Sequence, residues 1–144
     1  MSIIGNPVTA GGSGDVYEIF TIQNGWKEAT GTNDYAMPVQ DYKGPHFDEY
    51  AAVGNNGVVF SKDCILDISF GTKTCHDTRR AQTFVLKRVR GGVTETLATA
   101  QDTSVPAIYL SKVEMKSGDI LYGTEYNAYN MRTARYFVAY IINP

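Results

Sequence analysis

The side chains of this chain with the greatest chemical reactivity are its two cysteines and two histidines. Cys75, His76 and Asp77 are consecutive and have the residue types of a cysteine nucleophile with its general base. Adjacent residues of an extended strand point to opposite faces, so these side chains converge only in a turn. A turn with a free thiol is the interpretation we favour. We therefore predict no catalytic residue and no enzymatic activity.

A metal site is the second chemistry to consider. The potential soft ligands have spacings unlike those of common zinc sites, because the cysteines lie far apart. They are Cys64, Cys75, His46 and His76. The acidic residues that could bind calcium lack the dense alternation of a hand-type loop. They are Asp15, Asp34, Asp41, Asp48 and Glu49. We predict two separate thiols, solvated loop acids, and no metal ion or cofactor.

Basic residues gather at Arg79-Arg80 and at Lys87-Arg88-Val89-Arg90. They could bind an acidic glycan or a phosphate, but a solvated strand face balanced by acids such as Glu95 is the stronger interpretation. The formal net charge of -2 provides no strong field to attract nucleic acid or a membrane surface. We expect neither as a partner.

Tyrosines and asparagines crowd the segment Tyr122–Arg132, which we expect to be a loop before the last strand. A tyrosine ring can stack on a sugar while amides bind its hydroxyls, and tyrosine is equally common in contacts between subunits. Both alternatives stay open. The candidate ligand-binding residues are Tyr126, Asn127, Tyr129, Asn130 and Trp26.

Length and composition predict one folded domain. The 144 residues suffice for a sizeable core, and 43% are hydrophobic. Charged residues make up only 19%, which suggests that another chain covers part of the surface. No stretch has the length of a membrane span or a signal peptide. We assign residues 1–16, which are rich in glycine, to an N-terminal arm and residues 17–144 to the domain.

Period-two patterns predict an all-β fold. Cys64–Phe70 places its apolar side chains on one face, and the Gly91-Gly92 pair joins two extended runs as a hairpin. The final run, Arg135–Ile142, is apolar on both faces, which is typical of a central strand. Residues 27–49 are dense in turn signals and allow only short strands or an ordered loop. We expect eight to ten strands in a two-sheet antiparallel sandwich or jelly roll.

The later segments resemble the tumour necrosis factor-like (TNF-like) family. The similarity lies in the order of Gly57–Phe60 with Cys64–Phe70, the hairpin Phe84–Leu97, the Ser117-Gly118-Asp119 element with its flanking strands, and the closing Tyr136–Ile142. It covers roughly residues 45 to 143. The glycine usually found beside the closing phenylalanine is missing, since Phe137 is flanked by Tyr136 and Val138.

The resemblance implies a homotrimer in which aromatic and aliphatic faces meet on a three-fold axis. The residues expected at that interface are Tyr136, Val138, Tyr140, Ile142 and Tyr122.

The context we expect is a bacteriophage virion. The family includes the heads of phage fibres, and the opening Ile3-Ile4-Gly5-Asn6-Pro7 is similar to the start of phage structural proteins. The function expected is a trimeric fibre head or capsid decoration that acts by binding, with host-surface glycans as a candidate ligand. Its arm would dock on other virion proteins through Ile3, Ile4, Asn6 and Pro7. The alternative is a stand-alone bacterial lectin of the same fold.

Overall fold

Nine strands and one short helix make up the described part of the chain. The computed structural model describes residues 15–23, 27–36, 43–55, 57–74, 82–102 and 107–144. The strands are β1 (Val16–Gln23), β2 (Lys27–Ala36), β3 (Ala51–Gly54), β4 (Gly57–Phe60), β5 (Cys64–Thr74), β6 (Gln82–Arg90), β7 (Val93–Asp102), β8 (Ala107–Met115) and β9 (Ile120–Ile142), and the helix is α1 (Phe47–Tyr50). The predicted all-β class and the number of strands are confirmed.

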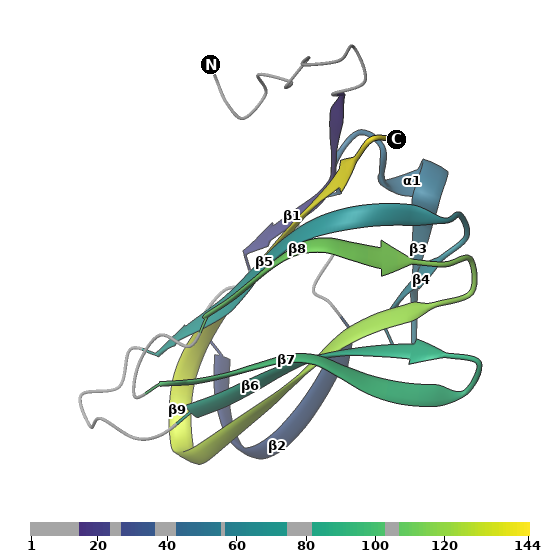
Figure 1. Cartoon of the computed structure of the whole chain (residues 1–144). Helices are drawn as coiled ribbons and strands as arrows, with labels where there is room; N and C mark the ends of the chain where they lie inside the picture. Colours follow the sequence, from purple (N-terminus) through teal and green to yellow (C-terminus); the bar gives the residue numbers. More distant parts are fainter. Residues whose placement is uncertain (1–14, 24–26, 37–42, 56, 75–81, 103–106) are drawn as a thin grey trace.

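The last strand, β9, is the centre of two layers (Figure 1). Its C-terminal half lies between β1 and β5, and β8 pairs with β5, which forms the upper layer of Figure 1. Its N-terminal half lies between β6 and β2, and β7 pairs with β6, which forms the lower layer. β4 pairs with the first residues of β9, and β3 pairs with β4. All pairs are antiparallel, so the predicted two-sheet sandwich is confirmed.

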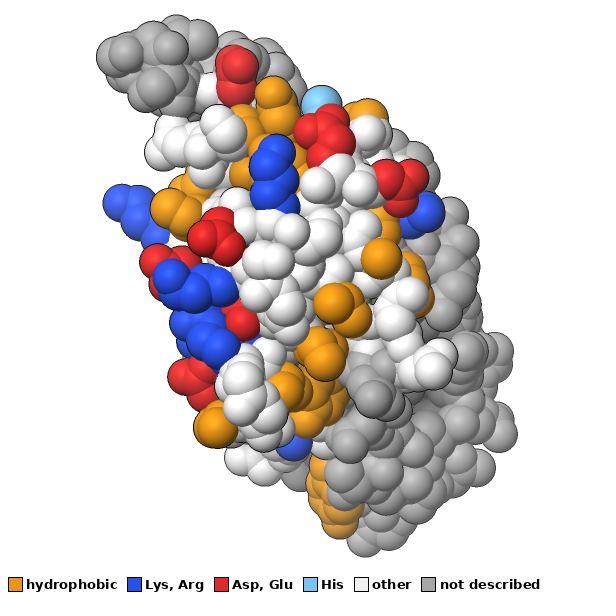
Figure 2. All heavy atoms as spheres, turned by 90° about the vertical axis from the view of Figure 1, so that its right-hand side faces the viewer, with side chains coloured by type: hydrophobic (Ala, Val, Ile, Leu, Met, Phe, Trp, Pro, Cys, Tyr) orange, Lys and Arg blue, Asp and Glu red, His pale blue; other side chains and the backbone are white. Residues whose placement is uncertain are grey.

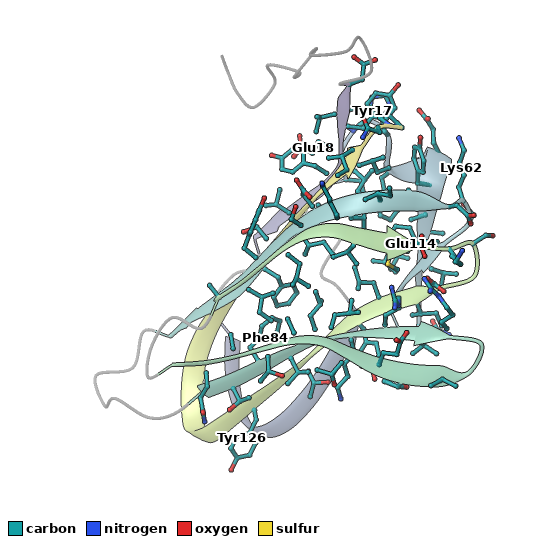
Figure 3. The ribbon with its side chains drawn as sticks, in the orientation of Figure 1. Tyr17, Glu18, Lys62, Phe84, Glu114 and Tyr126 are labelled. Carbon is teal, nitrogen blue, oxygen red and sulfur yellow. The ribbon has the colours of Figure 1, made fainter. Side chains whose placement is uncertain are left out.

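The core lies between the layers, and strand periodicity explains which side chains enter it. Leu66, Ile68 and Phe70 of β5 alternate with the partly exposed Asp67 and Ser69 and are fully buried, as the sequence predicts. From the lower layer, Phe84 of β6 reaches Phe70, and the ring centroids stand 3.9 Å apart. Figure 3 shows Phe84 directed into the space between the layers. Large rings from both layers therefore fill the centre of the sandwich.

The glycine pair between β6 and β7 makes the predicted tight turn. Gly91 has φ of 57° and Gly92 has φ of 77°, which are the signs that a type I′ turn requires at both central positions. Only glycine adopts this geometry at low cost. The hairpin is thereby closed in register, with Arg90 opposite Val93.

Two expectations for loops are wrong. Residues 27–36 form the ten-residue strand β2, whose pairing with β9 shifts between Ala29 and Gly31, where β9 has the additional residues. The expected loop Tyr122–Arg132 is part of β9, because β2 and β6 pair with it on both sides. Pairing on two edges overrides the local preference of asparagine and glycine for turns.

The division into an arm and a domain stays a prediction. Strand β1 begins at Val16, while residues 1–14, with the candidate anchor residues Ile3, Ile4, Asn6 and Pro7, lie outside the described residues. Within the described ranges, no helix has the length and apolar character needed to cross a membrane.

Candidate functional site

The outer face of the upper layer brings together most of the residues predicted for a subunit interface. Ala139 and Ile141 of β9 are buried in the core, so Val138, Tyr140 and Ile142 point to the opposite face and are half-buried. Neighbouring strands add exposed apolar side chains to it: Val16 at 39%, Ile65 at 39% and Tyr109 at 69% exposure. We call these the outer face residues: Val16, Ile65, Tyr109, Val138, Tyr140 and Ile142.

On this outer face, residues of neighbouring strands lie side by side in cross-strand rows. Tyr140 stands between Glu18 of β1 and Asp67 of β5, and Val138 shares its row with Ser69 and Tyr109. Partial burial, followed by the negative charge of Glu18, raises the pKa of Tyr140. The phenol is therefore neutral at physiological pH, and it can donate a hydrogen bond to a partner.

Asp67 fixes a bulge at the edge of this layer. The pairing of β5 with β8 shifts at Asp67, and Lys112 has a positive φ of 58°. The backbone N–H of Lys112 donates to Oδ1 of Asp67 over 3.0 Å. A side-chain acceptor thus replaces the ladder bond that the bulge removes.

The end of the sandwich that carries the β6–β7 and β8–β9 turns is held by ion pairs. Arg90 and Asp119 form a bidentate pair, with Nη2 of Arg90 2.6 Å from Oδ2 and Nε 3.0 Å from Oδ1. Arg88 donates from Nε and Nη2 to Oε2 of Glu95, at 3.1 and 2.9 Å. Both arginines also donate to the carbonyl of Glu114. Figure 2 shows acidic and basic side chains gathered on one side of this end.

Asp119 is the buried member of this network, with 2% of its side chain exposed. Burial opposes its ionisation, but the hydrogen bonds from Arg90 and from the backbone of Lys116, with the arginine charges, outweigh burial and lower its pKa. The carboxylate stays charged and joins β6 to the turn before β9. The basic run from Lys87 to Arg90 is therefore balanced by acids, as the sequence indicates.

Solved structures decide the fold. No protein-family model and no curated protein matches this chain. Murine APRIL matches in two crystal structures with a TM-score of 0.57 and 15% identity; the pH 8.5 structure covers 86% of this chain and 98% of that chain, and the pH 5.0 structure 85% and 96%. Eiger TNF from S. frugiperda matches with a TM-score of 0.50 and 15% identity, covering 87% and 92%. The chain has a TNF-like jelly-roll fold.

In this TNF-like fold, the Gly-Asp element has a visible structural role. Gly118 adopts a φ of 95°, and Asp119 turns back to accept from the backbone N–H of Lys116 at 2.8 Å while it pairs with Arg90. The sequence marked this element by resemblance, but it did not indicate the distant arginine.

The interface residues predicted for the TNF-like trimer do not all lie on one face. Tyr122 belongs to the lower layer, opposite Ala36 and Lys87, and Nζ of Lys87 stands 5.8 Å from its ring centroid. Tyr136 lies in the upper layer, paired with Gln23 and Gly71, and its side chain is outside the described set. The outer face therefore gathers three of the five predicted residues: Val138, Tyr140 and Ile142.

Of the predicted ligand-binding residues, Tyr126 alone has a described side chain. It is 47% exposed and points away from both layers (Figure 3). Asn127, Tyr129 and Asn130 lie on β9, but their side chains are outside the described set, as is the whole of Trp26. A shared site for these five residues stays a prediction.

His46, one of the candidate metal ligands, lies in an aromatic contact. Its ring stacks on Tyr17 with centroids 3.8 Å apart, and its Nδ1 lies 2.9 Å from Oε1 of Glu49. Beside it, the backbone N–H of Gly44 donates to the carbonyl of Ile19. These contacts fasten the start of β1 to the segment before α1, and no sequence pattern indicated them.

The thiol of Cys64 is half-buried, and burial, with the charges of Asp63 and Asp119, raises its pKa to about 12. It is protonated at neutral pH and is a poor nucleophile. Among the described residues, no cluster of histidine, cysteine and acidic side chains could hold a metal ion. Cys75, His76, Asp77 and Arg79-Arg80 lie outside the described residues.

Proposed function

We propose that this TNF-like domain is a bacteriophage structural protein, a trimeric fibre head or capsid decoration, that acts by binding. The observation that carries the proposal is the outer face of the upper layer, where Val138, Tyr140 and Ile142 are flanked by exposed Val16, Ile65 and Tyr109. Domains of this fold are typically non-catalytic binding modules that assemble as trimers. The virion context rests on the similarity of Ile3–Pro7 to phage structural proteins.

The outer face has the composition of a subunit contact. Its core is aliphatic and aromatic, and its charged members, Glu18 and Asp67, lie in one row with Tyr140. Tyrosine is enriched in such contacts because it contributes a large apolar surface and a polar tip. A neutral Tyr140 hydroxyl can donate to a carboxylate or carbonyl of a neighbouring subunit.

The molar mass in solution tests the trimer. Light scattering after size exclusion should give a mass that is a multiple of three chains. Val16→Lys combined with Tyr109→Lys should give species without that trimer, because lysines would be desolvated in the contact. Val53→Lys combined with Asn55→Lys is the matched control, since both residues are exposed and lie outside the strands of the upper layer. A monomeric wild-type chain at micromolar concentration would refute the trimer.

The virion context has its own test. A chain without residues 1–14 should keep the fold and trimer mass of the full chain, yet it should not enter virions. Incorporation of the truncated chain would contradict the proposed anchoring role of Ile3, Ile4, Asn6 and Pro7.

A stand-alone lectin is the second candidate, and exposed Tyr126 favours it. An aromatic ring on the solvent face of a sheet can stack on the apolar face of a sugar. On a glycan array, Tyr126→Ala should lose binding, whereas Tyr126→Phe should retain most of it because the ring is kept. Binding that survives Tyr126→Ala would exclude this site, and an array on which the full chain binds no glycan would favour decoration.

A further inference from the structure

The outer edge of the lower layer is formed by β7, which among the described residues is paired on one side only. Among the described residues, β6 is the only strand that pairs with β7. The hairpin forms the outer member of its layer in Figure 1. Most of β7 is exposed, including Val93 at 63%. Its outward backbone groups are therefore available to a further strand.

The turn determines which residues of β7 offer these groups. Arg90 and Val93 flank the two-residue turn and exchange hydrogen bonds, so alternate residues from Val93 face β6. The pairing shifts between Leu86 and Lys87, which leaves Leu97 as an extra residue. Beyond it the alternation is displaced by one. The residues whose backbone groups face away from β6 are Thr94, Thr96, Thr99 and Gln101.

This edge has few of the features that keep strands from pairing. The sequence of β7, VTETLATAQD, contains no lysine, arginine or proline. Of its two acids, Glu95 is paired with Arg88 through two hydrogen bonds, and Asp102 is the last residue of the strand. Threonine and valine are among the residues that favour strands. The edge is therefore long, low in charge and suited to extended pairing.

The outward residues are symmetric about the bond between Leu97 and Ala98. If a second β7 runs antiparallel, Thr96 lies opposite the partner's Thr99, and Thr94 lies opposite the partner's Gln101. In the same register Glu95 lies opposite the partner's Ala100, so no like charges meet. Threonine pairs across strands are favourable, whereas opposed like charges are not.

We propose that β7 pairs antiparallel with β7 of a second copy of this chain, which joins two lower layers into one continuous sheet. The self-complementary order of hydrogen-bonding residues around the bulge at Leu97 carries the proposal. The contact goes beyond the proposed trimer and does not depend on it, because the outer face residues belong to the upper layer. With both contacts, each trimer presents three β7 edges to other trimers.

Molar mass tests the pairing. Thr96→Lys with Thr99→Lys places two charges on each edge, whereas Ala52→Lys with Asn55→Lys adds the same charge at exposed positions elsewhere. A contact of small area is weak, so the masses are measured at concentrations up to roughly 100 µM. Wild type and control should have at least twice the mass of the edge variant. Equal masses for all three chains would overturn the proposal. If the trimer did not form but β7 paired, wild type and control would still have a higher mass than the edge variant. The mass ratio therefore tests the β7 contact separately from the trimer.

Cysteine cross-linking tests the register in a Cys64→Ser, Cys75→Ser background. Opposed residues that exchange hydrogen bonds have Cα atoms about 5.5 Å apart, within the range that a disulfide spans. Thr96→Cys with Thr99→Cys should give covalent dimers on oxidation. Thr94→Cys with Thr99→Cys, two residues out of register, should stay monomeric on denaturing gels. Equal yields of covalent dimer from the two pairs would overturn the proposed register.

Discussion

β7 and β8 are each paired with one described strand, yet their edges are protected very differently. β8 has a bulge at Lys112 whose backbone N–H is held by Asp67, and its Glu114 carbonyl accepts from both Arg88 and Arg90. The only comparable features of β7 among the described residues are the bulge at Leu97 and the acid Glu95, which is paired with Arg88. Three side chains from two other strands thus hold backbone groups of β8, while no described strand or side chain covers the outer side of β7.

The difference between β7 and β8 indicates that contacts distant in sequence protect the strand edges of this fold. Arg88 and Arg90 stand on β6, between the two edges, but they extend toward Glu114 and Asp119. Their hydrogen bonds bind the Glu114 carbonyl of β8, and Arg88 also pairs with Glu95 of β7. One pair of arginines therefore contacts both edge strands.

Among substitutions that affect the protected edge of β8, we expect Asp119→Asn to cause the largest loss of stability. The substitution leaves Arg90 without its carboxylate and should lower the free energy of unfolding by about 3 kcal/mol, the low end for a broken buried pair, since Arg90 is partly exposed. Urea unfolding measures it. Glu95→Gln, in a more exposed pair, is the control and should cost about 1 kcal/mol or less. Equal losses would show that burial of Asp119 does not matter.

Low pH should remove the stabilisation that the Arg90–Asp119 ion pair provides. The pKa of Asp119 is lowered in the folded chain, so its stabilisation is complete above the unfolded pKa of about 3.9 and is lost as pH falls toward the folded value. The difference in unfolding free energy between wild type and Asp119→Asn should therefore shrink below about pH 4. A difference that is constant from pH 7 to pH 2 would contradict this assignment.

A smaller effect is expected from Asp67→Ala, which removes the acceptor for the Lys112 N–H at the bulge of β8. The loss should be about 1 kcal/mol, the usual value for one hydrogen bond. Hydrogen exchange at Lys112 should accelerate at the same time. Asp48→Ala, which breaks an exposed contact with Lys43, should change stability by less than about 0.5 kcal/mol. Unchanged exchange at Lys112 would refute the role of Asp67.

The smallest expected effect is a gain in stability, from a substitution at the bulge of β8. Lys112 has a positive φ that glycine adopts without strain, so Lys112→Gly should stabilise the chain by about 0.5 kcal/mol after the entropy cost of glycine. Thermal unfolding would detect it as a higher midpoint. Ser111→Gly, at the neighbouring bulge position, should destabilise instead. A loss in both variants would mean that backbone strain at Lys112 is negligible.

Much of the fold was predictable because its signals are local. The alternation of Cys64–Phe70 and the Gly91-Gly92 turn depend on neighbouring residues only, and both are confirmed. The continuity of β9 was not predictable, because its Asn- and Gly-containing part is extended only through pairing with β2 and β6. The ten-residue β2 was missed for the same reason.

The candidate site was predictable in part. The TNF-like resemblance assigned Val138, Tyr140 and Ile142 to one interface, and in the structure they share a face. Tyr122 was assigned to the same interface, but it lies eighteen positions before Tyr140 on β9 and belongs to the other layer. The contacts of Arg90 with Asp119 and of Tyr17 with His46 join residues 29 apart in each case, beyond the reach of any local pattern.

The course of β9 has a consequence for the time needed to fold. Five strands, β1, β2, β4, β5 and β6, pair with this one segment. Neither layer has its central strand until β9 has been made, and until then the earlier strands have unpaired edges. The pairing of Val16 with Ile142 also closes a loop that contains every other strand. Folding of this domain should therefore be slow, in the range of milliseconds to seconds that is typical of non-local β pairing.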